Sequence, residues 1–267
     1  MTKEEEIKYV FANKDLIASK KKNAIKRGDL ILGNYTSDSE NKEVNKAGVD
    51  LSTQEVGILR AKLVINTTNV IDSHMDCHIP GIWNKTLSES KILYLLQEHE
   101  MEFDKIISDS VNDGLTATAE SISWKKLGYT YNGKTEALIF DVQIKKEVNP
   151  FMFDLYQKGR VLNHSVGMRY MKIFLCVDSN EPYYAAEKEA WDKYYPMVAN
   201  SEIADEKGYF WAVTEAKVIE GSAVVKGSNE FTPVMEIEID KSEPSADTQK
   251  EEPEQSTQTA IMKRRRN

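Results

Sequence analysis

The chain has 267 residues, a length that suits one large domain or two small ones with a core of ordinary size. Hydrophobic residues make up 40% of it, and the formal net charge of -8 argues against general nucleic-acid binding through a basic surface. No stretch approaches the ~20 apolar residues of a membrane helix, and MTKEEEIKYV at the start has no apolar core, so we expect no secretory signal. Two cysteines, Cys77 and Cys176, are too few for a disulfide scaffold and fit a reducing compartment.

Residues 1–54 are expected to form a helical arm followed by a polar loop. Apolar side chains recur at loosely helical spacing between residues 3 and 27, next to a basic cluster at residues 20–22. Such an arm is either solvated or docked on an acidic partner. The segment 36–53 is mostly polar and reads as loop.

Residues 55–239 are expected to form a mostly β domain. Strand-like patterns cover 55–68, 91–99, 113–124, 129–144, 161–177 and 209–225, with a hairpin signal at Asn132-Gly133. Asn149 and Pro150 are typical of a helix start, and Gly159 of its end. Residues 181–208 read as a helical insertion broken by Pro196. We therefore predict a closed or partly open β-barrel with a few peripheral helices.

Residues 240–267 have a different composition. The run from Asp240 to Thr259 holds two prolines and many acids, with Ala246 as its single hydrophobic residue. Such a segment cannot offset the entropy of ordering, so we predict a disordered acidic tail. It ends in the basic cluster Lys263–Arg266, which is typical of an interaction tail or a removable peptide.

Metal-ligand residue types gather between Asp72 and His78. The string holds His74, Asp76, Cys77 and His78, all of which can bind zinc. Its spacing matches no zinc signature, and polar residues are common before a Pro-Gly turn. A metal site here is therefore kept only as an alternative.

Three other residues have side chains that could take part in catalysis. His99 ends an apolar strand, Ser165 lies mid-strand two residues before Gly167, and Glu220 lies within an apolar strand. A histidine at a strand end is more often packed or capping, and Ser165 alone is a weak signal for a nucleophile. Glu220 suits a sheet edge or barrel end, or the carboxylate that orients a histidine.

These residues belong to a series of short motifs in a particular order. The series begins with an acidic stretch before Pro80-Gly81 and continues with the strand that ends in His99. Asp113-Gly114-Leu115 follows, then Ser165-Val166-Gly167-Met168, and last Glu220-Gly221-Ser222 with Asn229 and Pro233 behind it. Over residues 60–234 this order resembles the phage prohead (capsid maturation) serine protease family of the HK97 type. The chain departs from the family pattern at Met168, at Gly221 and in the insertion 181–208.

The resemblance implies a β-barrel similar to that of the herpesvirus assemblin proteases. It implies Ser165 as nucleophile and His99 as general base, with Glu220 as third member and His164 or Asp141 as weaker candidates. It also implies cleavage of capsid or scaffold precursor and of the chain itself, inside the assembling procapsid in the host-cell cytoplasm. No metal or organic cofactor, no direct nucleic-acid contact and no membrane are implied, and a homo-oligomer is compatible.

Two other functions remain open at this point. A non-catalytic scaffold or structural protein of the virion would explain the β-rich body and the charged tail equally well. A metal-dependent hydrolase would use the cluster between His74 and His78. The sequence has no Gly-x-Ser-x-Gly elbow, which disfavours an α/β-hydrolase.

Overall fold

The computed structural model describes residues 1–25, 57–89 and 91–239. About 38% of these residues are strand and 30% helix. The polar loop predicted at 36–53 and the disordered tail predicted at 240–267 lie outside the described residues. None of the helices in the described ranges is long and apolar enough to cross a membrane.

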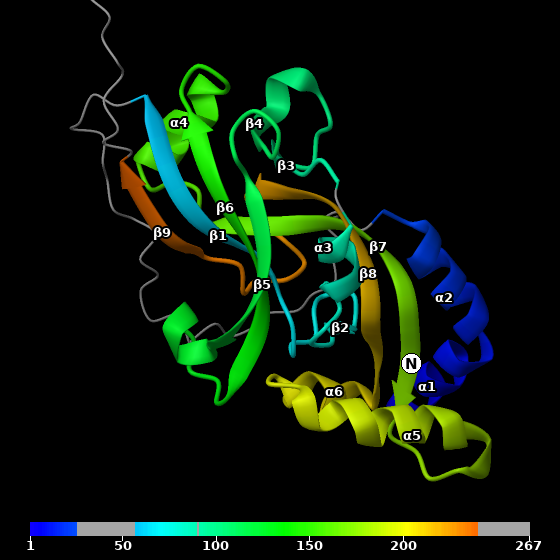
Figure 1. The fold of residues 1–267 in the computed structure, drawn as a ribbon. Coiled ribbons are helices and arrows are strands. Elements are labelled where there is room, and N and C mark those ends of the chain that lie inside the picture. The colour runs from blue at the N-terminus through cyan, green and yellow to red at the C-terminus, as the bar shows by residue number, and fades with distance from the viewer. Residues whose placement is uncertain (26–56, 90, 240–267) are drawn as a thin grey trace, which may run out of the picture.

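The strands form two sheets (Figure 1). The first has the order β5-β6-β1-β9 and is antiparallel throughout. Its strands are β1 (Ile58–Thr67), β5 (Thr116–Ser123), β6 (Lys134–Lys145) and β9 (Val234–Ile239).

The second sheet is built around one long strand, β8 (Tyr209–Val224). On one edge β8 pairs antiparallel with β7 (Asn163–Val177) along its whole length. On the other edge it pairs in parallel with β2 (Asp76–His78) and, further along, with β3 (Tyr94–Gln97). The short strand β4 (Ile106–Asp109) continues the sheet beyond β3.

A barrel is not formed by the described strands, so the predicted closed or partly open barrel is corrected to two sheets in a mixed α/β chain. One edge of β8 is divided between two short strands, β2 and β3, and bulges interrupt its pairing with β7 three times. Bulges bend a strand and increase its twist, so the two long strands curl without closing on the first sheet.

Buried side chains between the two sheets form the main core. They include Leu63, Phe140 and Val218 from the strands and Phe153 and Tyr156 from α4 (Pro150–Gln157). The N-cap of α4 is Asn149, whose side chain accepts a hydrogen bond from the Met152 backbone N–H at 3.0 Å, which confirms the predicted helix start.

The remaining helices are peripheral. The insertion is helical as predicted, and α3 lies against β8. Their bounds are α3 (Asn84–Ser88), α5 (Ala185–Tyr194) and α6 (Ser201–Lys207).

The hairpin expected at Asn132-Gly133 is wrong in one respect. Gly133 does turn the chain into β6 with φ of 82°, but the partner strand β5 ends earlier, at Ser123. The connection contains a 3-10 turn (Trp124–Leu127), and Trp124 packs edge-on against Tyr129 and Phe231. Ladder pairing continues to Ser123 and Lys134, and aromatic packing covers the longer connection that replaces a two-residue turn.

The N-terminal arm consists of two helices, α1 (Lys3–Ala12) and α2 (Lys14–Asn23), where the sequence suggested one. The first does not run through solvent: Ile7 and Val10 are buried against Val177, Tyr209 and Trp211 in a separate apolar cluster. The predicted arm therefore packs on the end of the β7–β8 pair at which β7 ends and β8 begins (Figure 1).

Replacing Ile7 with Ala should lower the free energy of unfolding by about 2 kcal/mol, because it leaves a cavity under α1. The matched control is Leu16→Ala in α2, whose side chain is exposed and whose loss should cost less than about 0.5 kcal/mol. Urea denaturation of both variants measures the difference. Equal effects would mean that α1 contributes no buried contact.

Candidate active site

Ser165 and Glu220 lie on the same face of the β7–β8 pair. In the register of these strands Ser165 is opposite Ser222, and Gly167 is opposite Glu220. Directly opposed residues of antiparallel strands point to the same side, and side chains alternate along each strand. The side chains of Ser165, Glu220 and Ser222 therefore share one face, and the next residue along, His164, points to the other.

Gly167 leaves the space that the Glu220 side chain occupies. A Cβ atom added to Gly167 would lie 1.8 Å from Oε1 and 2.6 Å from Cδ of Glu220. The carboxyl group thus lies directly over the glycine backbone. Any side chain at position 167 would displace it.

His99 comes directly after β3 in an uncommon backbone conformation. Glu98 and His99 have φ values of 50° and 60°, in the left-handed region that non-glycine residues rarely adopt. Two bonds to β8 and one to the residue that follows it hold them there. The Glu98 N–H donates to the Ala223 carbonyl at 3.0 Å, the Val225 N–H to Glu98 Oε1 at 2.9 Å, and the His99 N–H to Ser222 Oγ at 3.1 Å.

The imidazole of His99 bonds to the buried carboxylate of Glu220. His99 Nδ1 lies 2.7 Å from Glu220 Oε1, and Ser222 Oγ donates to Glu220 Oε2 at 2.6 Å. Glu220 is 1% exposed. A buried carboxylate is costly unless it is hydrogen-bonded, and here each of its oxygens has a partner.

The arrangement has the chemical parts of a nucleophile, a base and an orienting carboxylate. With Nδ1 bound to Glu220, the proton exchange of a general base would fall to the other ring nitrogen, Nε2. Ser165 is the direct strand neighbour of Ser222, whose hydroxyl bonds both the Glu220 carboxylate and the His99 backbone. The structure thus brings His99 and Glu220 into contact and sets Ser165 beside them.

The two weaker candidates for the third member lie elsewhere. His164 Nε2 is 2.9 Å from the Tyr156 hydroxyl, and complete burial lowers the pKa of His164 to about 4. Asp141 is exposed on β6, opposite Lys62 and Thr116 in the first sheet. Of the three residues, Glu220 is the one hydrogen-bonded to His99.

The residues between His74 and His78 do not converge as metal ligands. Both ring nitrogens of His78 have partners, Asn66 Oδ1 at 3.0 Å and the Tyr170 hydroxyl at 3.1 Å, and Cys77 packs in an apolar cluster with Cys176. In the part of the chain that the structure describes, no three His, Cys, Asp or Glu side chains group as metal ligands.

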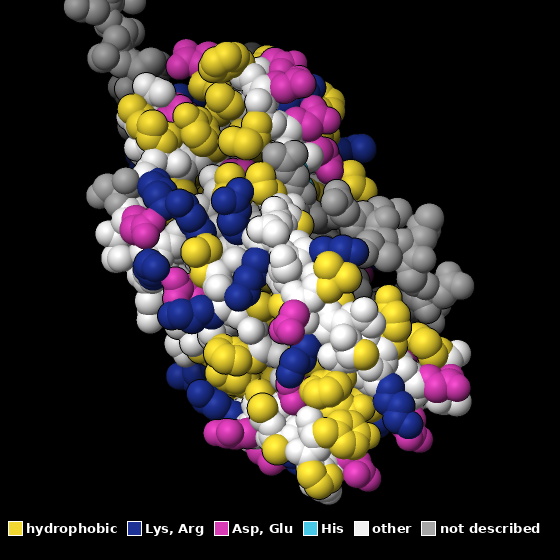
Figure 2. Space-filling view, turned by 90° about the vertical axis from the view of Figure 1, so that its right-hand side faces the viewer, with side chains coloured by type: hydrophobic (Ala, Val, Ile, Leu, Met, Phe, Trp, Pro, Cys, Tyr) yellow, Lys and Arg dark blue, Asp and Glu magenta, His cyan; other side chains and the backbone are white. Residues whose placement is uncertain are grey.

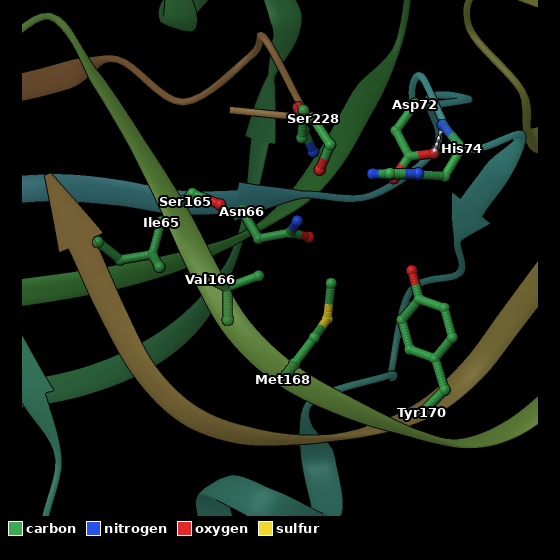
Figure 3. A pocket seen from close by; sticks show the side chains of 10 residues that line it. Ile65, Asn66, Asp72, His74, Ser165, Val166, Met168, Tyr170 and Ser228 are labelled. Carbon is green, nitrogen blue, oxygen red and sulfur yellow. Dashed lines mark hydrogen bonds between the residues drawn. The ribbon is translucent and has the colours of Figure 1, made fainter. Parts of the chain in front are cut away.

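A small pocket extends from Ser165 towards that segment (Figure 3). Val166, Met168 and Tyr170 line it along β7, and Asp72 and His74 line its far end. Burial, followed by the nearby Asp76 charge, raises the pKa of Asp72 to about 7. Asp72 Oδ1 accepts the backbone N–H groups of His74 and Asp76 at 2.8 and 2.9 Å, which fixes the loop beside Ser165.

The residue pattern predicts no individual role for Ser222, and for Gly167 it predicts only a close backbone approach by a substrate or another strand. Both lie within the matching motifs, and strand alternation alone puts Ser222 on the face of Glu220 and Gly167 on the face of Ser165. Gly221, a departure from the family pattern, has a packing reason on the opposite face: a Cβ atom there would lie 2.6 Å from Cε2 of Phe140. Met168, the other departure, is buried in the main core.

Comparison of the chain with protein-family models, with curated proteins and with solved structures found no match.

Gly167→Ala should lower the free energy of unfolding by about 1–3 kcal/mol, because the new methyl group overlaps the Glu220 carboxyl group. Gly57→Ala is the matched control, since an added Cβ there meets nothing within 4 Å. Thermal and urea unfolding of both variants measure the effect. A Gly167→Ala protein as stable as the control would contradict the close approach of Glu220 to β7.

Proposed function

We propose that the chain is a serine endopeptidase in which Ser165 is the nucleophile, His99 the general base and Glu220 the orienting carboxylate. The observation that carries this proposal is the 2.7 Å contact between His99 Nδ1 and Glu220 Oε1, on the strand face that also bears Ser165. A structural protein has no need of a buried His–carboxylate pair beside a serine. The histidine tautomer that this pair selects is the one that serine hydrolysis requires.

The proposed reaction follows from the roles of these atoms. Ser165 Oγ attacks the scissile carbonyl carbon while His99 Nε2 takes the hydroxyl proton. The C–N bond then breaks, His99 returns the proton to the leaving amine, and the acyl group stays on Ser165. Water then attacks the acyl carbon while His99 Nε2 takes one of its protons. The bond from the acyl carbon to Ser165 Oγ breaks, His99 returns the proton to Ser165 Oγ, and the acyl group leaves as a carboxylic acid. The Glu220 carboxylate bonds His99 Nδ1 and stabilises the imidazolium at each stage.

The biological setting is proposed from the resemblance to the prohead proteases. The substrates would be capsid or scaffold precursor and the chain itself, cleaved within the assembling procapsid in the host-cell cytoplasm. The reaction as written uses no metal or organic cofactor.

Ser165→Ala should abolish reaction with a fluorophosphonate probe, because the probe phosphorylates an activated serine with loss of fluoride. Removing a triad nucleophile typically costs orders of magnitude in rate. Labelling of the wild-type protein, located by peptide mass spectrometry, should map to Ser165. The same variant, co-expressed with capsid precursor, should leave the precursor uncleaved on a gel.

Two results would overturn the proposal. One is a folded wild-type protein that the probe does not label, and the other is normal precursor processing by Ser165→Ala. Either would favour the non-catalytic scaffold or structural role.

Within this proposal, Ser222 acts as a positioning residue. Its hydroxyl donates to Glu220 Oε2 and accepts from the His99 backbone N–H, so one side chain fixes the carboxylate and the backbone of the base together. Ser222 is fully buried, and no solvent can replace these bonds without rearrangement. Misplacement of a reacting group by about 1 Å is enough to cost ~100-fold in rate.

Ser222→Ala should therefore lower the maximal rate of fluorophosphonate labelling by roughly 10- to 100-fold, with little change in the probe concentration at half-maximal rate. The matched control is Ser108→Ala, because Ser108 is also fully buried in a strand and its hydroxyl has no hydrogen-bond partner among the described residues. Ser222→Thr keeps the hydroxyl and should recover part of the rate. Equal maximal labelling rates of Ser222→Ala and Ser108→Ala would contradict the positioning role of Ser222. They would not bear on the assignment of Ser165 as the nucleophile.

A further inference from the structure

The outer face of the β7–β8 pair carries more positive than negative charge. Five cationic side chains gather there around two carboxylates, Glu89 and Glu215. The five, called here the basic face, are Lys85, Lys91, Arg169, Lys172 and Lys217. Figure 2 shows Lys and Arg side chains gathered across the middle of one side of the molecule. In a chain whose formal net charge is -8, such a local excess is unexpected.

The charges within the basic face are not balanced. Glu215 is shared by Lys85 at 3.0 Å and Lys172 at 2.5 Å. Lys91 pairs with Glu89, and Lys217 interacts with the same carboxylate. Among the described residues no carboxylate forms an ion pair with Arg169, so five cations face two anions.

Repulsion between two of these cations destabilises the pairing of β7 with β8. Arg169 and Lys217 are direct partners in the β7–β8 register, and like charges in that position repel. Lys91 is the main cause that holds the pKa of Lys217 below its usual range, and burial and Arg169 add smaller contributions in the same direction. A cost of this kind on an exposed strand pair is offset when an anionic partner binds there.

The basic face adjoins the candidate active site. Arg169 has the same strand parity as Ser165 and Gly167, and both Arg169 and Lys217 are exposed. Four residues of strand separate Arg169 from Ser165, which is about 13 Å at ~3.3 Å per residue. An extended polypeptide with its reacting carbonyl at Ser165 would reach Arg169 within about four residues.

We propose that the basic face binds an acidic polypeptide segment, and that the acidic run 240–259 of this chain is one such segment. That run contains six acids and two lysines, a formal charge of 2 − 6 = −4. Its acids are Asp240, Glu243, Asp247, Glu251, Glu252 and Glu254. Nucleic acid fits less well, because the molecule as a whole is negatively charged.

The binding itself does not depend on catalysis, but the role of the bound segment as substrate rests on the proposed function. When an acidic segment binds the basic face, the residues that flank it would lie next to Ser165. Its binding should weaken with salt, since exposed charges are screened within ~10 Å at 0.1 M. The preference for acidic segments would then select which part of a precursor is cleaved.

The test measures binding of a fluorescein-labelled peptide with the sequence of residues 240–259, by anisotropy, to the full chain carrying Ser165→Ala. In a second full chain the six acids of the run are changed to Asn or Gln, which removes competition by the tethered segment. The peptide should bind this neutral-tail chain at least ~10-fold more tightly than the natural-tail chain, because a tethered ligand acts at high effective concentration.

In the neutral-tail background, Arg169→Glu with Lys217→Glu should weaken peptide binding by at least ~10-fold. Lys125→Glu with Lys126→Glu is the matched control: it makes the same charge change at exposed lysines beyond the end of β5, in the other sheet. Circular dichroism melting checks that both double variants are folded.

Equal affinity of the two double variants would overturn the proposal. So would tighter binding of a 20-nucleotide single-stranded DNA than of the peptide, which would make the basic face a nucleic-acid surface. Peptide binding that depends on Arg169 and Lys217, together with a folded chain that keeps Ser165 and yet is not labelled by fluorophosphonate, would keep this inference and reject the peptidase.

Discussion

The buried carboxylate of Glu220 is the feature on which the rest of the site depends. A carboxylate that is 1% exposed is tolerated only when its oxygens are hydrogen-bonded, and here the bonds come from His99 and Ser222. The same pair of bonds fixes the imidazole orientation and the backbone of the loop that carries it. Removing either partner would leave one buried carboxylate oxygen without its hydrogen bond, so the same contacts serve both the site and the local fold.

This carboxylate also dictates the surrounding backbone. It lies over Gly167 because no side chain intervenes, and the residue beside it, Gly221, lets Phe140 pack against the other side of β8. The left-handed conformation of His99 is uncommon, and strain of this kind persists only where neighbouring contacts enforce it. Bonds from Glu98 and His99 to β8 supply that enforcement.

A second buried polar network ties the N-terminal arm to the same sheet. Lys21 of α2 forms an ion pair with Asp76 and donates to the His74 carbonyl at 3.0 Å. Asp76 Oδ2 also accepts from the Tyr170 hydroxyl at 2.9 Å, on the β7 face that lines the pocket. The arm is thus linked through β2 to the wall of the pocket that begins at Ser165, whereas its sequence left open a solvated arm or one docked on an acidic partner.

The sequence by itself determined the local elements and the chemical residue types. Alternation predicted most of the strands, and Asn149 with Pro150 predicted the start of α4, because these signals act over a few neighbouring residues. The motif order singled out Ser165, His99 and Glu220. Only the tertiary structure decided that Glu220, and not His164 or Asp141, bonds to His99, because their strands lie far apart in sequence and pairing register sets which side chains meet. The tertiary structure also shows that the described sheets do not close into a barrel. The bulges, and the pairing of one edge of β8 with both β2 and β3, depend on long-range contacts that residue patterns do not encode.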